Sequence, residues 1–420
     1  MTLTYENYYS WWTFGISLLT MVVVLNVVLG ICAYLILVER KVAAWMQDRI
    51  GPNRVGPWGL LQPIADGVKF LIKEDIIPDH VDRLFFILAP AIAVATSLFA
   101  IVVVPFGPTQ APPSRPWPET AAQAQQETAA NPGFVDAVKQ YNEGYQFVIA
   151  PHVDVGFLLV FAIGSLAVYG IILGGWSSND KYSFLGALRS SAQVISYEIP
   201  MGLSVLGVVL LSGSLNLERI IDQQVVVDGN WNILWQPLAF LLFLTAILAE
   251  CNRLPFDLPE AEQELVGGYH TEYSAMKFAL FFLGEYAHMI VTCFLLVALF
   301  LGGWQFPWIG TPTSPWAVRV IIFLLKMLAV IVFEMFIRWT LPRFRFDQLM
   351  GLAWKVFIPL ALLNVVAVMV VEHLQASRWW LLLVSVVLLF AAAIAGLWRR
   401  AAPPERLVVY RGHQYVELTR

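Results

Sequence analysis

The chain has little charge for its length. Asp, Glu, Lys and Arg together make up 13% of its 420 residues, and hydrophobic residues make up 58%, whereas soluble domains carry about 25% charged residues. The mean hydropathy of +0.67 points the same way. This composition excludes a string of soluble domains and predicts an integral membrane protein.

Cysteine and histidine are also scarce, and neither is arranged for metal binding. The three cysteines, Cys32, Cys251 and Cys293, form no C-x-x-C pair, and the six histidines include no pair with ligand spacing. The pattern therefore predicts no disulfide framework, zinc site or iron–sulfur site. The chain also lacks a phosphate-cradling glycine loop and a basic face for nucleic acid, so we expect no nucleic-acid partner.

Long apolar runs are what the chain has in abundance. Nine of them approach or exceed the roughly 18 residues that cross a bilayer. They cover residues 14–38, 84–105, 154–174, 191–212, 231–249, 276–301, 317–337, 354–371 and 379–397, with the fifth and eighth the weakest. We expect an all-α polytopic membrane protein of about nine transmembrane helices, with one transmembrane domain at 1–398 and a tail at 399–420. The first run is too long for a signal-peptide core, so it should stay in the mature chain.

Basic residues are distributed unevenly between the two sides of this membrane domain. Twenty of the 26 Lys and Arg residues fall in segments on one side and five on the other, with Lys326 inside a run. Because Lys and Arg accumulate in cytoplasmic loops, the N-terminus is predicted outside. Segments 39–83, 250–275 and 399–420 are then cytoplasmic. The external loop 107–152, with seven prolines, is either a solvated loop or an insert that docks a partner.

The first cytoplasmic segment contains an amphipathic stretch, Leu60–Asp75. Its apolar residues recur on one helical face and its charged residues on another: Ile64, Val68 and Leu71 against Asp66, Lys69 and Lys73. This pattern predicts a helix that lies at the membrane surface or against a protein partner. Such a helix is either a structural element or the wall of a ligand channel.

Four acidic or lysine residues lie inside the predicted spans and away from their ends: Glu198, Glu285, Lys326 and Glu334. A charge at the centre of a span costs about 2.5–3.5 kcal/mol, which makes each a functional candidate. Pro200 removes a helix hydrogen bond next to Glu198 and predicts a kinked, polar site there.

The other three ionisable residues have different neighbours along their helices. Glu285 shares a face with His288, three residues on, and the two are predicted to form a relay pair. Glu334 lies one turn before Arg338, which favours a surface ion pair. The role of Lys326 stays open.

The stretch Ala249–Tyr273, AECNRLPFDLPEAEQELVGGYHTEY, is strongly acidic although it lies between two apolar runs. It holds six carboxylates against one cation, Arg253. Asp257 is predicted to be a helix N-cap, and the helix dipole favours Glu260 in the first turn, but the other acids lack such a reason. Two carboxylates about 6 Å apart repel by roughly 3 kcal/mol at an effective dielectric of about 20, which brings the pKa of one nearer neutrality.

Interleaved apolar residues predict that this acidic stretch is packed rather than free. We therefore expect it to take up and release protons, or to respond to a nearby redox change. A solvated acidic loop is the alternative.

Four long stretches carry a resemblance to a known family. They are Glu39–Asp75, Gly174–Pro200, Ala249–Met289 and Arg338–Leu360, about a third of the chain. The chain resembles the quinone-site membrane subunit of proton-pumping NADH:quinone oxidoreductase, respiratory complex I, called the H subunit in bacteria. The departures are small: Ala275 stands where many relatives have Gly, and Phe346 where Tyr is usual. The resemblance implies an eight-helix core plus a C-terminal helix.

The resemblance also implies roles for particular residues. A quinone entrance and chamber would involve Glu39, Arg40, Trp45, Asp66, Phe281, Phe282, Arg338, Arg343 and Arg345. An acidic route for proton coupling would involve Glu198, Glu250, Asp257, Glu260, Glu262, Glu264, Glu272 and Glu285. No catalytic residue is expected on this chain alone, because a neighbouring subunit would supply most of the groups that reduce the quinone head.

The same resemblance implies the surroundings of the chain. Quinone (ubiquinone or menaquinone) would be the substrate, with FMN, NADH and iron–sulfur clusters on partner subunits. Partners would be the subunit with the terminal iron–sulfur cluster, its quinone-site neighbour, small membrane subunits, antiporter-like pumping subunits and membrane lipids. The location would be the bacterial cytoplasmic (inner) membrane rather than the mitochondrial one.

Three other functions compete with this hypothesis. The first is the homologous membrane subunit of an energy-converting hydrogenase-type complex, against which the intact LPRFRFDQLMGLAWK stretch argues. The second is a stand-alone cation/proton antiporter, which needs no docking surface such as the crowded segment 39–83. In the third, the subunit is only a scaffold whose acids serve assembly.

Overall fold

The computed structural model describes residues 11–109, 147–150, 153–224, 229–257, 266–307, 309, 314–401, 406–411 and 414–419. Most of the predicted external loop therefore lies outside the described residues. So do Glu260, Glu262 and Glu264 of the acidic stretch. Within the described part the fold is helical, as predicted, apart from one short hairpin near the C-terminus.

Every apolar run forms helix. The long helices are α2 (Trp11–Met46), α4 (Arg83–Ala100), α7 (Gly156–Ser177), α8 (Lys181–Ser212), α11 (Pro237–Glu250), α13 (Ala275–Phe300), α14 (Trp316–Thr340), α16 (Ile358–His373) and α17 (Trp379–Ala401). Shorter elements are α3 (Gln62–Ile72), α9 (Leu217–Asp222), α10 (Asn232–Trp235), α15 (Phe346–Leu352), η1 (Pro57–Gly59), η2 (Ile101–Val103), η4 (Gly268–His270) and η5 (Ala353–Phe357). Among the described residues, seven helical segments are long and apolar enough to cross a membrane, and α11 and Trp379–Ile394 are shorter apolar helices.

Several boundaries differ from the prediction because helices continue beyond their apolar runs. The loop predicted from residue 39 begins later, since α2 runs to Met46 and carries Glu39, Arg40 and Trp45 on helix. The predicted loop 174–190 is mostly helical, because Asp180 caps α8 by accepting hydrogen bonds from the backbone N–H groups of Tyr182 and Ser183.

The two weakest predicted spans are both interrupted. The fifth is divided into α10 and α11 at Gln236, and Pro237 occupies the first turn of α11, where its missing N–H costs nothing. The eighth is assembled from α15, the wider π-type turn η5 and α16. Both interruptions explain why the sequence signal was weak there.

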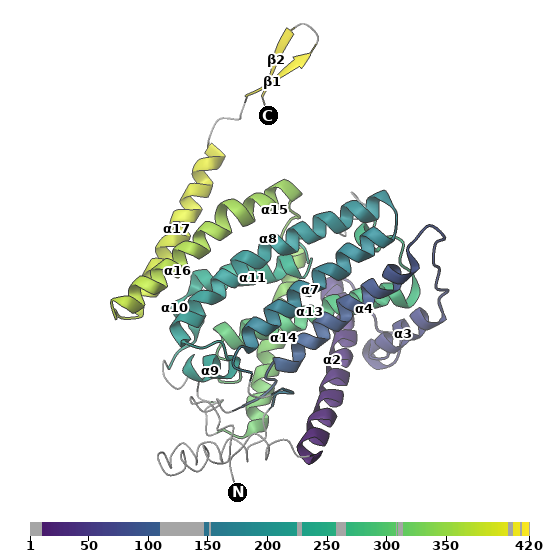
Figure 1. Ribbon diagram of the computed structural model, residues 1–420, viewed down its shortest axis with the longest axis horizontal. Helices are drawn as coiled ribbons and strands as arrows, with labels where there is room; N and C mark the ends of the chain where they lie inside the picture. The colour runs from purple at the N-terminus through teal and green to yellow at the C-terminus, as the bar shows by residue number, and fades with distance from the viewer. Residues whose placement is uncertain are drawn as a thin grey trace.

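The tail departs from the all-α prediction. Strands β1 (Arg406–Arg411) and β2 (Gln414–Thr419) pair antiparallel, with Arg406 opposite Thr419 and Arg411 opposite Gln414. Figure 1 shows this hairpin beyond the end of α17, away from the helical bundle.

Helix α13 lies at the centre of the bundle and contacts α2, α4, α11 and α14. Helix α4 fits tightly between α7 and α13 because glycines face it on both sides. A Cβ on Gly170 of α7 would lie 3.0 Å from the Ala89 carbonyl oxygen, and one on Gly284 of α13 would lie 3.1 Å from the Ala93 carbonyl oxygen. Small residues at such crossings are typical of membrane helices.

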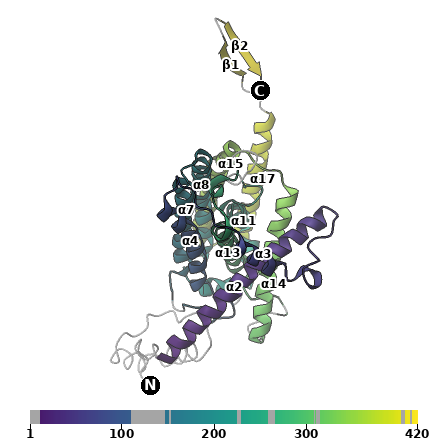
Figure 2. The same ribbon diagram turned by 90° about the vertical axis from the view of Figure 1, so that its right-hand side faces the viewer.

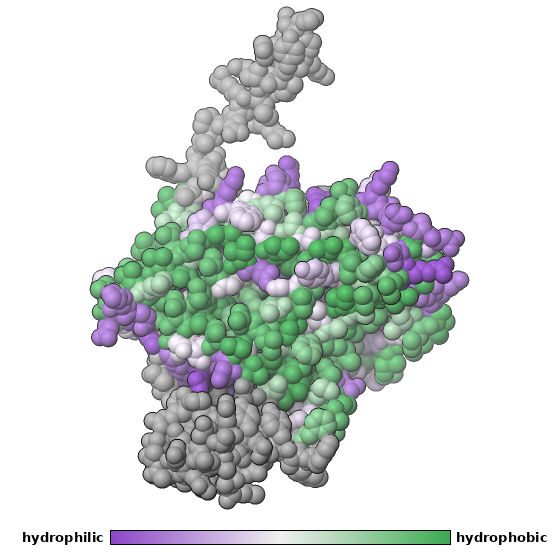
Figure 3. All heavy atoms as spheres, in the orientation of Figure 1, coloured by the Kyte–Doolittle hydropathy of each residue, from purple (hydrophilic) through white to green (hydrophobic). Residues whose placement is uncertain are grey.

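The outer surface of the bundle is apolar. Figure 3 shows a broad hydrophobic band on one face with hydrophilic residues gathered at its margins. Large apolar side chains such as Leu19, Leu325 and Phe390 are exposed on it. A surface of this kind fits a lipid environment and confirms the expected multi-pass membrane protein.

The bundle has two ends that matter for the site. We call the α3 end the one formed by the last turns of α2 and α14 together with α3. The α9 end is the opposite one, where α13 finishes near α9 and α14 begins. Figure 2 shows α2, α3 and α14 grouped on one flank of the bundle, away from α4, α7 and α8. The basic-residue bias predicts that the α3 end faces the cytoplasm.

Candidate functional site

A cavity of about 680 Å³ opens at the α3 end between α2, α3, α13 and α14. Its walls are mainly apolar and include Cys32, Ile36, Phe70, Met276, Phe278, Ala279, Phe282 and Leu283. Five residues expected at a quinone entrance or chamber line it: Glu39, Arg40, Asp66, Phe282 and Arg338. The volume lies within the roughly 300–1,000 Å³ typical of ligand pockets.

One ion pair joins α2 to α3 at the cavity, and further contacts within α3 hold its carboxylate. Arg40 Nη1 lies 2.7 Å from Asp66 Oδ2, and Lys69 Nζ lies 3.9 Å from Asp66 Oδ1. Gln62 Nε2 also donates to Asp66 Oδ1, at 3.3 Å. The predicted amphipathic helix is therefore present as α3, and its polar face is tied to the end of α2.

The apolar face of α3 is largely exposed, although Leu71 at its end also lines the cavity. Ile64, Val68 and Leu71 are 60%, 47% and 71% exposed. This exposure agrees with the predicted contact with a membrane surface or a partner. Because Gln62, Asp66 and Phe70 line the cavity, α3 also forms one of its walls.

A cluster of charged side chains surrounds Glu39, a cavity-lining residue that is 6% exposed. Arg253 Nη1 donates to both of its carboxylate oxygens, at 2.9 and 2.8 Å. Tyr286 Oη donates to Oε2 at 2.5 Å, and Arg338 Nη1 donates to Oε1. Breaking such a buried pair by removing one partner is costly, so this cluster joins α2, α13 and α14 firmly.

Arg253 enters the bundle from the turn after α11. Gln193 Nε2 on α8 holds that turn by donating to the carbonyls of Ala249 (2.7 Å) and Phe256 (2.8 Å). Burial alone would lower the pKa of Arg253, but Tyr286 and Glu285 raise it above its ordinary value. Arg253 is therefore a permanent cation beneath the cavity.

A line of acids leads from this cluster into the bundle. Arg253 Nε lies 3.8 Å from Glu285 Oε1, and His288 Nε2 lies 3.2 Å from Glu250 Oε1. The Ser165 hydroxyl donates to Glu198 Oε1. The predicted Glu285–His288 relay stays a prediction: the two side chains interact electrostatically, and each also contacts a group on another element, Glu285 the Arg253 side chain and His288 the Glu250 carboxylate.

Other predicted site residues lie outside the cavity lining. Trp45 is 68% exposed near the end of α2. Phe281 faces a different aromatic cluster and lies edge-on to Tyr273, with ring centroids 4.9 Å apart. Arg343 Nη2 lies 3.4 Å from Asp257 Oδ2, and Arg345 begins α15 with its backbone N–H donated to Gln348. Phe281 missed the lining because neighbouring positions on a helix face different directions.

Glu272 and Glu334 are the remaining acids for which the sequence suggested a role. Glu272 is half-buried in the turn before α13, and its place on the acidic route stays a prediction. The predicted ion pair between Glu334 and Arg338 is wrong, because Arg338 is taken up by Glu39 and Glu334 is buried against Cys293 of α13 at 3.2 Å.

The sequence analysis missed several residues of the site: Ser165, Gln193, Tyr286, Cys293 and the full role of Arg253. The one available signal was that Arg253 is the single cation among six carboxylates. Uncharged partners such as Tyr286 give no such signal.

An aromatic wall beside the cavity contains a histidine. His270 packs against Phe278 and Phe282, both of which line the cavity, with ring centroids 5.2 and 6.1 Å away. Burial lowers the pKa of His270 to about 4. The ring is therefore neutral at physiological pH and supports the wall as an apolar group.

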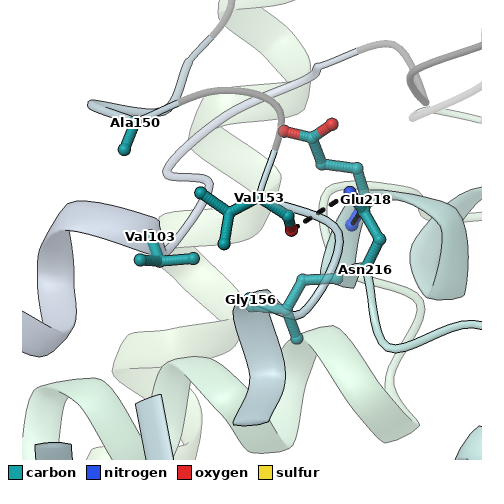
Figure 4. A pocket seen from close by; sticks show the side chains of 7 residues that line it. Val103, Ala150, Val153, Gly156, Asn216 and Glu218 are labelled. Atoms are coloured by element: carbon teal, nitrogen blue, oxygen red, sulfur yellow. Dashed lines mark hydrogen bonds between the residues drawn. The ribbon is translucent and has the colours of Figure 1, made fainter. Parts of the chain in front are cut away.

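A second, much smaller cavity lies at the α9 end (Figure 4). Its volume is about 10 Å³, which is about the space of one water molecule. Asn216 Nδ2 donates to the Val153 carbonyl beside it at 3.4 Å. Burial raises the pKa of Glu218, which lines it, to about 8, with Asp222 acting in the same direction. This cavity is too small for an organic ligand.

The described residues contain no group of three or more His, Cys, Asp or Glu side chains arranged to hold a metal ion. The residues that line the large cavity include charged side chains, hydrogen-bonding side chains and many apolar side chains. These features define a polytopic helical membrane protein with an interhelical cavity that is lined in part by a buried charge cluster.

The chain belongs to the NADH dehydrogenase family, whose model matches residues 19–369. It is 49% identical to the H subunit of the NADH-quinone oxidoreductase of Thermomicrobium roseum over 363 residues, 85% of this chain and 96% of the relative. It is 47% identical to the H subunit numbered 2 of Koribacter versatilis, over 83% of this chain and 95% of that one. It is 46% identical to the H subunit numbered 1 of Geobacter metallireducens, over 84% of this chain and 94% of that one.

These matches confirm the family that the four sequence stretches indicated. They also confirm the expectation that the chain is one subunit of an enzyme complex. The match ends at residue 369, so α17 and the hairpin lie beyond the family model.

Proposed function

We propose that this chain admits quinone through the α3-end cavity and couples its reduction to proton movement. The observation that carries the proposal is the cavity itself, which combines apolar walls with charged lining residues at Glu39 and Arg338. A quinone has the matching division, a long apolar tail and a ring with two hydrogen-bond acceptors. The names of the relatives, all NADH-quinone oxidoreductase subunits, support the same substrate.

The acids beneath the cavity are the proposed coupling route. Arg253 contacts both Glu39 and Glu285, His288 contacts Glu250, and Ser165 donates to Glu198. His288 also interacts electrostatically with Glu285 and Glu198, which brings the three groups of contacts into one line. A change of charge at the cavity is felt along such a line, because interactions between buried charges are weakly screened. Glu260, Glu262, Glu264, Glu272 and Asp257 of the acidic stretch are proposed to belong to the same route.

The remaining parts of the proposal concern the surroundings of the chain. NADH, FMN and iron–sulfur clusters would reside on partner subunits, and ubiquinone or menaquinone would reach this chain from the membrane. The peripheral-arm subunits of the quinone site would dock at the α3 end, and the small and antiporter-like membrane subunits beside the bundle. The location would be the bacterial inner membrane, with the α3 end in the cytoplasm.

Narrowing the cavity tests the quinone site. In the assembled complex, Ala279→Trp places a large ring in the cavity and should raise the KM for a long-tailed quinone by about tenfold, which corresponds to about 1.4 kcal/mol of lost binding. Leu362→Trp, at an exposed position on α16, is the matched control and should leave the KM unchanged. An unchanged KM in Ala279→Trp, with normal assembly, would overturn the proposed site.

Neutralising one acid tests the coupling route. Glu198→Gln keeps the side-chain size and should lower proton pumping and quinone reduction together in the assembled complex. Glu372→Gln, at the exposed end of α16, is the control with the same chemical change. Unimpaired quinone reduction and proton pumping in Glu198→Gln would contradict the proposed coupling role. Normal assembly of this variant with lost turnover would argue against a subunit that acts only as a scaffold.

A further inference from the structure

The two interrupted spans, the fifth and the eighth, each place a buried amide side chain against α8. Gln236 stands at the break between α10 and α11, and Asn364 lies on α16 in the eighth span. Gln236 is 0% exposed and Asn364 is 2% exposed. Helices α11 and α16 both contact α8 and also contact each other. The two amides are therefore buried where three helices meet.

The backbone of Gln236 is paired, but its side chain is not. Its N–H donates to the Asn232 carbonyl at 2.8 Å, and its carbonyl accepts from the N–H of Phe240 at 3.1 Å. Its Oε1 and Nε2 have no hydrogen-bond partner in the described part of the chain, and the side chain does not cap α11. Asn364 Nδ2 also has no partner there. Because an unpaired buried polar atom costs free energy, such atoms in proteins are bonded to protein groups or to ordered water.

Gly207 of α8 shows that the two amides face one point. A Cβ on this glycine would lie 2.7 Å from Gln236 Oε1 and 3.3 Å from Asn364 Nδ2. Glycine weakens a helix interior relative to alanine, and Gly207 lies inside α8 without a positive φ. The missing side chain, and not backbone freedom, therefore accounts for this glycine, because it leaves room for the amides.

A donor and an acceptor face this point without bonding to each other. Asn364 Nδ2 donates and Gln236 Oε1 accepts, but no hydrogen bond joins them. A water molecule bridges such a pair, since it accepts from Nδ2 and donates an O–H to Oε1. The bridge also works with the Gln236 amide flipped, because one water accepts from two N–H donors. An anion fits less well, because the Oε1 oxygen repels it.

We propose that Gln236 and Asn364 bind an ordered water molecule between α8, α11 and α16, beside Gly207. Broken helices are tolerated inside membrane proteins where ordered waters and neighbouring helices satisfy the freed polar groups. One water at this point supports both interrupted spans at once. The site is separate from the α3-end cavity, which none of its three residues lines, so the inference does not depend on the proposed quinone site.

Cryo-electron microscopy of the assembled complex, at a resolution that shows ordered water, tests the site. We expect a density peak about 2.7–3.2 Å from both the Gln236 and the Asn364 amide. The peak should remain when the complex is prepared in gluconate instead of chloride. A direct bond between the two amides without a peak would overturn the inference, and so would a peak that disappears with chloride.

Two glycines of α8 provide matched variants. An added Cβ at Gly207 crowds Gln236 Oε1, whereas one at Gly202 meets nothing within 4 Å. Because alanine favours helix, Gly202→Ala should keep or raise the thermal midpoint and keep the peak. Gly207→Ala should lower the midpoint by several degrees and displace the peak. Equal midpoints, with the peak unchanged in both variants, would contradict a water site beside Gly207.

Asn364→Leu supplies a second test if Gly207→Ala does not assemble. This variant removes the group that donates to the water and fills its place with an apolar side chain of similar size. We expect the peak to be lost while Gln236 stays in position. A peak that remains at the same place in Asn364→Leu would overturn the inference.

Discussion

Arg253 at the α3 end is buried and Lys326 at the α9 end is half-buried, and the partners of the two basic side chains differ. Lys326 Nζ donates to the carbonyls of Leu301, Gly303 and Gln305 at 2.6, 3.1 and 2.5 Å, and it lies 4.3 Å from the centroid of the Trp231 ring. Arg253 instead faces the carboxylates of Glu39 and Glu285. Backbone carbonyls do not take up protons in this pH range and are fixed by the main chain. Carboxylates can be protonated, and their side chains can move away from the cation.

The two ends therefore serve different purposes. At the α9 end, Lys326 satisfies carbonyls of the C-cap and the turn that follow α13, where a cation is favoured by the helix dipole, and it connects α14 to that turn. At the α3 end, the charges adjoin a cavity and one acid keeps an unpartnered oxygen. Buried polar groups that are fully paired make a structure rigid, and partly paired ones beside a cavity allow it to respond.

Removing Arg253 should have the largest effect. Arg253→Met leaves Glu285 without its cation and should cost about 3–5 kcal/mol, the usual penalty for breaking a buried ion pair. We expect little assembled complex after solubilisation and a lower thermal midpoint. The double variant Arg253→Met/Glu285→Gln should recover part of the loss, since Arg338 still balances Glu39. A single variant as stable as the wild type would show that the cluster does not hold the α3 end together.

Glu218 should make the α9 end sensitive to pH. Its pKa is raised from 4.5 to about 8, so its neutral form favours the fold fully below about 4.5, and this contribution is lost as the pH rises through about 8. Each unit of pKa difference corresponds to about 1.4 kcal/mol. Thermal midpoints of the complex across this range should fall less steeply in Glu218→Gln. Identical slopes would contradict the buried, unpaired carboxyl.

Lys326→Met should destabilise the chain without altering turnover. The variant leaves three carbonyls without their donor, which should cost about 1–3 kcal/mol. We expect a lower thermal midpoint at every pH, with the KM for quinone and the pumping of the surviving complex unchanged. Lys326→Arg keeps the charge and should lose less. A loss of pumping at normal stability would erase the contrast between the two ends.

The smallest effect is expected at the mouth of the cavity. The pair of Arg40 and Asp66 is partly exposed, and such pairs contribute about 0–1 kcal/mol. Arg40→Ala should therefore change the thermal midpoint little, and any loss should vanish at high salt. A large fall of the thermal midpoint that persists at high salt would contradict this, and would show that the Arg40–Asp66 pair contributes as much as a buried ion pair.

The sequence predicted helix types well and helix ends poorly. Apolar runs identify membrane helices directly, because a chain segment in lipid must satisfy its backbone hydrogen bonds internally. Each of the nine runs is helical. The ends at residues 39 and 191 were missed because α2 and α8 continue into polar sequence once a cap or a tertiary contact supports them. The hairpin of the tail gave no such signal.

The site was predictable only in part. Resemblance placed Glu39, Arg40, Asp66 and Arg338 at one location, and all four line the cavity. Their partners were not predictable, since Glu39 is 214 residues from Arg253 and 299 from Arg338. Such pairs depend on how α2, α13 and α14 pack, and a uniform apolar run carries no information about that packing.

Photoaffinity labelling with an azido-quinone tests the central claim most directly. In the assembled complex, we predict labelling of peptides from the cavity walls, residues 32–43, 62–71, 276–286 and 338–339, with competition by unmodified quinone. Ala279→Trp should reduce this labelling and Leu362→Trp should not. Labelling confined to other parts of the chain, with these four segments unmarked, would contradict a quinone path through the α3-end cavity.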